Sequence, residues 1–434
     1  MKRFLFAVGA LAATVFAPAF AQNTERYEQP PINYSATQPQ DAITLLQARL
    51  ASGELKLAGS DREIMQALLH ELKIPIESQV VVFSKTSLQR QHIRPGHPRA
   101  LYFSDDCYVG WLPSGLIEVT AIDPVLGPVF YALDPAMVRT NTIRSFVRDN
   151  DCLRCHGGVF VRDIPGLFVR SLFTDKNGEP LLQYGSEVVD FRTPFANRWG
   201  GWYVTGKHGT ALHRGNVFTR AQAGEPEVDL KRGANLTDLA PFFDTATYLT
   251  NSSDIVALLV LEHQTAMQNT LTRASLDCRR MLDYQKNLQR ELKEPVTDEL
   301  VYDSVKSVFD GTARAIVDDL LFQGEAALPA GLAGSPAFQQ AFQQNARRTP
   351  AGQSLKDFSL KGHLFENRCS YFIYSDSFLQ LPLLLRQRVY DHLARILQPD
   401  NTEPRYAYLT GDERKRIREI LRATHKELAA VFAR

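Results

Sequence analysis

The chain has 434 residues, of which 44% are hydrophobic and 22% charged, with 49 Lys and Arg residues against 48 Asp and Glu. This composition excludes collagen-like, low-complexity and wholly disordered chains, and the length allows two or three domains. The formal net charge is only +1, and zinc-finger, RGG and RNP patterns are absent. We therefore expect no nucleic-acid partner.

The first 21 residues have the pattern of a secretory signal peptide. Residues 2–3 supply positive charge, residues 4–16 form an apolar run, and Ala19, Phe20 and Ala21 match a small-x-small cleavage site. The apolar run is too short to span a bilayer core of about 30 Å. We expect cleavage after Ala21, a periplasmic or secreted mature protein and no stable membrane anchor.

The first half of the mature chain predicts two helices followed by short strands. Residues 22–40 are polar with little periodicity, which predicts a flexible lead-in. Apolar side chains recur at helical spacing in residues 42–52 and 61–72. Runs rich in Val, Ile, Phe and Tyr predict strands at residues 79–83, 100–103, 108–112, 117–122, 128–132, 167–173, 181–189 and 201–205.

From about residue 251 the pattern becomes helical. Helices are predicted at residues 254–293, 298–321, 377–397 and 410–433, with Thr297 capping the second and Thr410 and Glu413 forming a capping box on the fourth. The fold class is therefore α+β. We expect an N-terminal mixed antiparallel sheet domain over residues 41–250 and a C-terminal helical domain over residues 251–434.

A C-x-x-C-H motif, Cys152-Leu-Arg-Cys155-His156, stands among the predicted strands. It is typical of covalent attachment of a c-type haem. Two thiols reach the two vinyl groups at one edge of the porphyrin, and the adjacent imidazole approaches the iron. We expect one haem c per chain, with Cys152 and Cys155 as thioether positions and His156 as the proximal iron ligand.

Three other uses of two such cysteines compete with this interpretation. A thioredoxin-like redox pair usually lies in a βαβ unit, and none is predicted around the motif. Half of a zinc site would need a second Cys or His pair at matched spacing, and the sequence has none. A disulfide across two residues is uncommon. The adjacent histidine and the export signal favour haem.

Residues 152–156 resemble the attachment site of c-type cytochromes. Small class I cytochromes c carry this motif near the start of a helical chain, whereas here it follows strand-like segments. The alternation of short strands around the motif is similar to that of haem-c-bearing PAS-like periplasmic sensor domains. The first resemblance implies electron transfer, and the second implies sensing.

The sixth iron ligand divides these functions, because a second axial side chain suits electron transfer and an open position suits ligand binding or catalysis. His208 lies in a glycine-flanked loop and is the first candidate for the distal ligand. His213 is the second and His263 the third, while Met137 is a core residue on the simplest interpretation. The aromatic run 199–203 either lines a haem pocket or packs in the core.

The leading hypothesis is an exported monohaem c-type protein that transfers one electron. The redox partner is not identified by the sequence. The alternative is a haem-based sensor or ligand-binding module whose helical half relays the signal, and a protein without haem is the remaining possibility. No hydrolase motif is present, and a dihaem peroxidase would need a second attachment motif. The odd set Cys107, Cys278 and Cys369 allows one disulfide and one free buried thiol.

Overall fold

The computed structural model describes residues 25–139 and 146–433. The predicted signal peptide and its cleavage site lie outside the described residues. Helices and an antiparallel sheet are both present, which confirms the α+β class. Within the described residues, no helix is both long enough and apolar enough to cross a membrane.

The elements follow one another in the order expected from the sequence. The helices are α1 Ala42–Ser52, α2 Asp61–Glu71, α3 Pro135–Arg139, α4 Leu153–His156, α5 Ile255–Glu291, α6 Asp303–Leu320, α7 Pro336–Gln343, α8 Asp376–Leu379, α9 Leu383–Ile396, α10 Gly411–Thr424 and α11 Lys426–Phe432. The strands are β1 Val80–Val82, β2 Arg99–Phe103, β3 Cys107–Trp111, β4 Ile117–Asp123, β5 Gly127–Leu133, β6 Val147–Arg148, β7 Val169–Leu172, β8 Ser186–Val189, β9 Trp202–Tyr203, β10 Lys207–His208 and β11 Leu332–Ala333.

The main sheet is an antiparallel meander. Its strand order is β6-β5-β4-β3-β2-β1-β9, so consecutive strands from β1 to β6 are neighbours. Two smaller ribbons pair β7 with β8 and β10 with β11. The last pairing joins the loop after β9 to a segment that follows α6.

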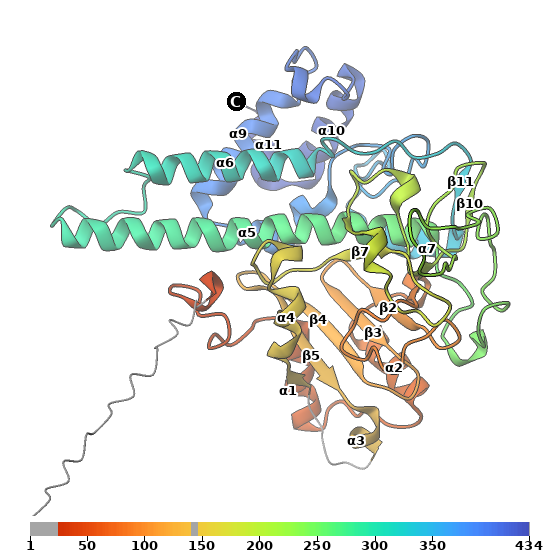
Figure 1. Ribbon diagram of the computed structural model, residues 1–434. Helices are drawn as coiled ribbons and strands as arrows, with labels where there is room; N and C mark the ends of the chain where they lie inside the picture. The colour runs from red at the N-terminus through yellow and green to blue at the C-terminus, as the bar shows by residue number, and fades with distance from the viewer. Residues whose placement is uncertain (1–24, 140–145, 434) are drawn as a thin grey trace, which may run out of the picture.

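Alternate residues of the strands point to opposite faces of the sheet. Val81, Tyr102 and Val109 belong to a core cluster that also contains residues of α1 and α2. Phe103 and Phe130 belong to a second cluster that contains residues of α5. The sheet is therefore covered by helices on both faces (Figure 1).

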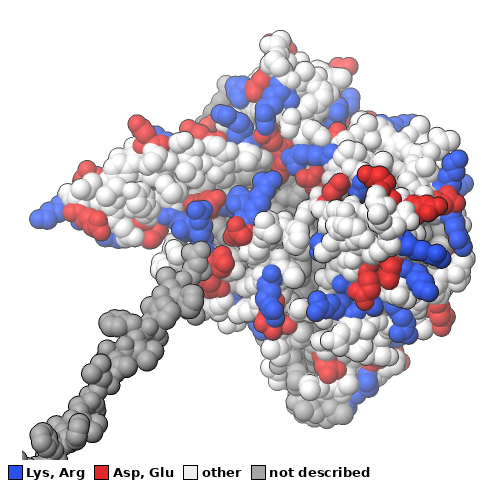
Figure 2. Space-filling view, in the orientation of Figure 1, with Lys and Arg blue, Asp and Glu red and all other residues white. Residues whose placement is uncertain are grey.

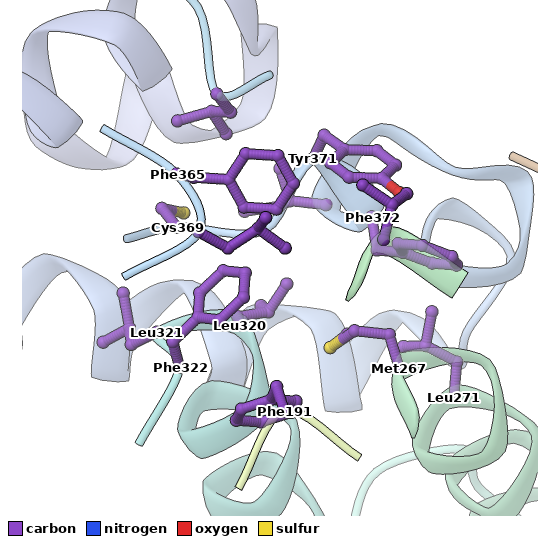
Figure 3. Packing of buried hydrophobic residues seen from close by; sticks show 14 of the residues in the cluster. Phe191, Met267, Leu271, Leu320, Leu321, Phe322, Phe365, Cys369, Tyr371 and Phe372 are labelled. Atoms are coloured by element: carbon purple, nitrogen blue, oxygen red, sulfur yellow. The ribbon is translucent and has the colours of Figure 1, made fainter. Parts of the chain in front are cut away.

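The 37-residue helix α5 is the longest element, about 56 Å at 1.5 Å per residue. It pairs with α6 in a hairpin that projects beyond the sheet in Figure 1. Near the other end of α6, side chains from α5, α6 and the segment 365–372 pack together (Figure 3). This second cluster runs without a break from the sheet to α11. Charges of both signs are interspersed over the face shown in Figure 2.

The stretch before α1 is more ordered than the sequence suggests. Tyr27, Ile32 and Tyr34 are buried. The hydroxyl of Tyr34 donates a hydrogen bond of 2.6 Å to the carbonyl of Pro128 in β5. Residues 25–40 therefore contain a packed segment where we expected a flexible lead-in, because these apolar side chains find partners on the sheet.

The boundaries of three C-terminal helices differ from the prediction. α6 begins at Asp303 and not after Thr297, because Gln285 of α5 accepts from the backbone N–H of Val301 at 2.9 Å and donates to the carbonyl of Glu299 at 2.7 Å. These bonds hold residues 299–301 outside the helix. Pro382 separates α8 from α9, since proline lacks the N–H that a continuous helix needs. A break at His425 separates α10 from α11.

The three cysteines outside the motif form no disulfide. Cys107, Cys278 and Cys369 are all free thiols and at most 1% exposed. Burial raises the pKa of Cys278 and of Cys369 to about 12. Each thiol packs as a small apolar side chain, and the disulfide that the odd number of cysteines allowed is not formed among these three.

Candidate haem-attachment site

The C-x-x-C-H motif forms a single helical turn. The side chain of Asp149 accepts a hydrogen bond from the backbone N–H of Asp151 at 2.9 Å and opens this turn. Residues three and four apart on a helix share a face, so Cys155 and His156 lie on the same face as Cys152. Both thiols are free. The local backbone thus presents the two thiols and the imidazole in one direction.

His156 is held by the backbone of Gly166. The imidazole Nδ1 lies 2.9 Å from the carbonyl oxygen of Gly166, and the N–H of Gly166 donates to the carbonyl of His156 at 2.8 Å. No described residue is hydrogen-bonded to Nε2 of this ring. Iron-ligating histidines typically donate their second ring nitrogen to a carbonyl in this way, which fixes the tautomer and the ring orientation. Burial lowers the pKa of His156 and favours the neutral ring that binds metal.

Two aromatic rings flank the imidazole. The ring centroids of Phe130 and Phe168 each lie 4.9 Å from that of His156, with interplanar angles of 42° and 33°. Asn269 of α5 fixes the neighbouring backbone, because its amide donates to the carbonyl of Leu167 at 2.6 Å and accepts from its N–H at 2.8 Å. The orientation of His156 therefore depends on the loop after the motif and on α5.

The thiols and the imidazole line one cavity. Its empty volume is about 1210 Å³, a figure that includes open solvent at the cavity mouth. The sheet supplies one wall, β7 another, and Leu261 and Thr265 of α5 a third. Trp202 also lines the cavity, whereas Trp199 is fully buried in the core. Two thiols, an imidazole and aromatic walls suit a haem.

The candidate distal ligands lie elsewhere in the structure. His208 is only 1% exposed and is not among the residues that line the cavity. Its Nδ1 lies 2.7 Å from the carbonyl of Ala211, and its Nε2 accepts from the backbone N–H of Asn235 at 2.9 Å. Both ring nitrogens are thus engaged. The ring of His213 packs against that of His208, with centroids 4.7 Å apart.

His263 and the methionines also lie away from the motif cavity. His263 is fully buried, stacks on Phe322 at 4.3 Å and bonds through Nε2 to the hydroxyl of Ser370 at 2.8 Å. Met267, labelled in Figure 3, is a core residue. Met137 lies in α3 and is 40% exposed. The structure brings Cys152, Cys155 and His156 together and does not bring the distal candidates to them.

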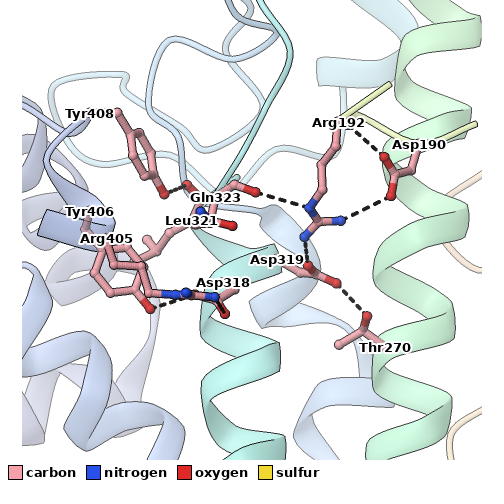
Figure 4. A network of polar contacts seen from close by, with 10 residues as sticks. All are labelled: Asp190, Arg192, Thr270, Asp318, Asp319, Leu321, Gln323, Arg405, Tyr406 and Tyr408. Atoms are coloured by element: carbon pink, nitrogen blue, oxygen red, sulfur yellow. Dashed lines mark hydrogen bonds and ion pairs between the residues drawn. The ribbon is translucent and has the colours of Figure 1, made fainter. Parts of the chain in front are cut away.

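A second, polar cavity adjoins the first. The two cavities share Leu167, Phe168 and Thr265. In the second, Arg192 pairs with Asp190 after β8 and with Asp319 of α6. Figure 4 shows this network, together with a two-bond contact of 2.6 and 2.8 Å between Arg405 and Asp318, and the hydroxyl of Thr270 on Asp319. These contacts tie the segment after β8 to α5, α6 and the C-terminal helices.

Several residues around the site were not predicted from the sequence. Gly166 acts through its backbone carbonyl, and Asn269 acts through two hydrogen bonds to the backbone of Leu167. No sequence motif indicates either contact. Arg99 of the cavity wall carried a detectable signal, since it is a charged residue that alternates with the buried residues Ala100 and Tyr102 of β2. A polar group at such a position points into a core or a site.

Comparisons with family models, with curated proteins and with solved structures found no match to this chain. Within the described residues, no three or more His, Cys, Asp or Glu side chains are grouped so that they could hold a metal ion.

Proposed function

We propose that this chain is an exported monohaem c-type protein that transfers one electron through a haem attached at Cys152 and Cys155 and ligated by His156. The observation that carries the proposal is the engagement of Nδ1 of His156 by Gly166 beside a cavity that both thiols line. A covalently bound haem would supply a one-electron redox centre whose potential depends on its axial ligands and its surroundings.

The chain's own residues have separate tasks in this proposal. Cys152 and Cys155 anchor the porphyrin edge, and Gly166 keeps the imidazole of His156 in a single orientation. Phe130 and Phe168 exclude water from the faces of the His156 imidazole. This exclusion lowers the local dielectric constant and would affect the redox potential of the haem. An unidentified redox protein would exchange electrons with the haem.

The test is the pyridine haemochrome spectrum of protein produced by an exporting host with its haem-attachment machinery. The wild-type protein is expected to give a c-type spectrum and haem staining on a denaturing gel. Replacing both Cys152 and Cys155 by Ser should abolish the staining. The matched control is Cys107→Ser, because Cys107 lies outside the cavity and should leave the staining unchanged. Wild-type protein without covalent haem would contradict the proposal.

The second candidate is a haem-based ligand-binding or sensor module. It is favoured by the lining of the cavity, in which no described residue other than His156 offers an imidazole or a thioether. Under this candidate the haem-bearing part, residues 41–250, would pass a change at Phe168 through the Arg192 network to the helical part, residues 251–434. Rapid binding of CO to the reduced protein would support this function, and a low-spin haem inert to CO would support electron transfer alone.

A further inference from the structure

One wall of the motif cavity is built around a guanidinium. Leu101 of β2 and Glu118 of β4 both lie opposite Gly110 of β3 in the register of the sheet. The side chain of Arg99 crosses Gly110. A Cβ added at Gly110 would come within 2.1–2.7 Å of the guanidinium atoms of Arg99. Glycine at this position therefore makes room for the arginine on the cavity face of the sheet.

The guanidinium is fixed from one side only. It forms an ion pair with Glu118, whose side chain is 20% exposed. The amide of Gln89 donates to the same carboxylate at 3.0 Å and is itself bonded to the backbone of Leu116. Arg99 is thus positioned before any ligand arrives, which reduces the entropy that binding would cost.

Two donors on this wall have no hydrogen-bond partner among the described residues. They are Nε of Arg99 and the hydroxyl of Tyr108, both shielded from solvent. Tyr108 is only 7% exposed and lies on the same face of β3 as Gly110. Buried donors in native proteins are normally paired, and an orphan indicates a missing water, ion or ligand.

The charge of the cavity selects the class of ligand. Arg99 and Arg170 line it against the single carboxylate of Glu118, so positive charge is in excess. Guanidinium and phenol groups are hydrogen-bond donors that match carboxylate and other oxyanion oxygens.

We propose that Arg99 binds an oxyanion in the motif cavity, with the hydroxyl of Tyr108 as a second unpaired donor on the same face of the sheet. This inference rests on the proposed haem site. It adds that the ligand bound in the cavity carries an oxyanion group. Two sources share this chemistry, a propionate of the haem itself and a free small oxyanion such as nitrite. The experiment below separates the two sources.

Oxidised holoprotein is titrated with sodium nitrite and followed by the haem absorption spectrum, after pyridine haemochrome has established haem content. With a free oxyanion as ligand, wild-type protein binds nitrite saturably and Arg99→Met binds it about tenfold more weakly or worse, as expected for a lost charge-assisted hydrogen bond. Tyr108→Phe weakens binding to a smaller extent. Affinity of the reduced protein for CO changes by less than about threefold in all variants, because CO carries no charge to pair.

Arg170→Met is the matched control, because Arg170 lines the same cavity but already donates to the hydroxyl of Ser186 at 2.5 Å and stacks over Phe160 at 4.6 Å. Because Arg170 adds positive charge to the cavity but leaves no buried donor unpaired, its replacement should weaken nitrite binding by no more than about threefold, against about tenfold or more for Arg99→Met. Arg99→Lys keeps the positive charge opposite Glu118, so it provides a second test if Arg99→Met fails to fold. It should bind nitrite with intermediate affinity.

The outcomes separate cleanly. Unchanged nitrite affinity with a midpoint potential shifted in Arg99→Met, but not in Arg170→Met, identifies the oxyanion as a haem propionate. If Arg99→Met changes neither the nitrite affinity nor the midpoint potential, the proposed oxyanion site is wrong. If wild-type protein contains no haem, the proposed function fails, and the oxyanion site is then tested by nitrite quenching of tryptophan fluorescence. In haem-free protein, the oxyanion site is contradicted if nitrite quenches wild-type protein and Arg99→Met equally, or if it quenches neither of them.

Discussion

The imidazole of His156 and the carbonyl of Gly166 are 2.9 Å apart, and the backbones of the same two residues are joined by a second bond of 2.8 Å. The histidine of the motif is therefore fixed by a residue ten positions later in the chain. Gly166 is itself confined, since an added Cβ would meet Asn269 and Val161 at 2.8 Å. The geometry of the motif depends on this loop as much as on the helical turn that carries it.

Asn269→Ala tests that dependence. The change removes two hydrogen bonds to the backbone of Leu167, and we expect it to lower the free energy of unfolding by about 1–3 kcal/mol. The loop that orients His156 would loosen, so the haem midpoint potential should shift as well. Asn287→Ala is the control, because Asn287 lies on the exposed face of the same helix. Equal behaviour of the two variants would show that the clamp does not act on the site.

His208→Ala tests the predicted distal ligand. With the ring placed between Ala211 and Asn235, its loss should leave the spin state of the haem unchanged. Because two hydrogen bonds of a buried side chain disappear, stability should fall by about 1–3 kcal/mol. Absorption spectra of the oxidised protein, with thermal unfolding in parallel, measure both effects. A change from low to high spin would instead show that His208 leaves its loop and binds iron.

Leu320→Ala probes the core between α6 and the segment 365–372. Leu320 is fully buried (Figure 3), so the lost contacts and the cavity left behind should cost about 2–5 kcal/mol in denaturant unfolding. Leu383→Ala, at a site 56% exposed, should change stability by less than about 0.5 kcal/mol. Similar losses in both variants would contradict the packing described here.

Buried histidines predict loss of stability in acid. Burial lowers the pKa of His263 from its usual 6.5 to about 3, and that of His213 equally. Since each ring is neutral in the folded state, the stability it contributes is complete above pH 6.5 and is lost as the pH falls from 6.5 towards 3. Each histidine should contribute a slope of about 1.4 kcal/mol per pH unit within that window.

His263→Phe should reduce the slope of stability against pH by the contribution of one histidine. Phenylalanine can keep the stacking on Phe322 but does not titrate. Urea unfolding at several pH values between 7 and 4.5 measures the slope. The exposed His92, replaced by Phe, serves as the control and should leave it as in wild type. An unchanged slope in His263→Phe would show that this ring is not the group that titrates.

Local patterns predicted most of the elements. α1 has the predicted bounds, and the strands from β1 to β5 lie within one or two residues of theirs, because apolar alternation and helical spacing are properties of short segments. The side chain of Thr410 accepts from the N–H of Glu413 as a helix cap, which is half of the predicted capping box, and the carboxylate of Glu413 pairs with Arg368. Pro382 was a visible signal for a helix break that the prediction passed over.

The environment of single side chains was harder to predict. His208 lies in β10, which pairs with Leu332–Ala333 far along the chain, and its ring is bonded to Asn235. No local pattern contains these contacts. The start of α6 was misplaced for the same reason, since Gln285 of another helix holds the residues before it. Motif residues are identified by spacing alone, but their surroundings are made by long-range packing.

The placement of α5 has a consequence for how the protein is made. Leu261 and Thr265 close one wall of the motif cavity, yet they follow the strands and the motif in the chain and are synthesised after them. If the chain is exported as proposed, the segment 150–156 is therefore accessible for a period in which its final wall has not yet docked. With haem attached as proposed, the thioether bonds can form on an open chain, and the arrival of α5 then encloses a cofactor that is already in place.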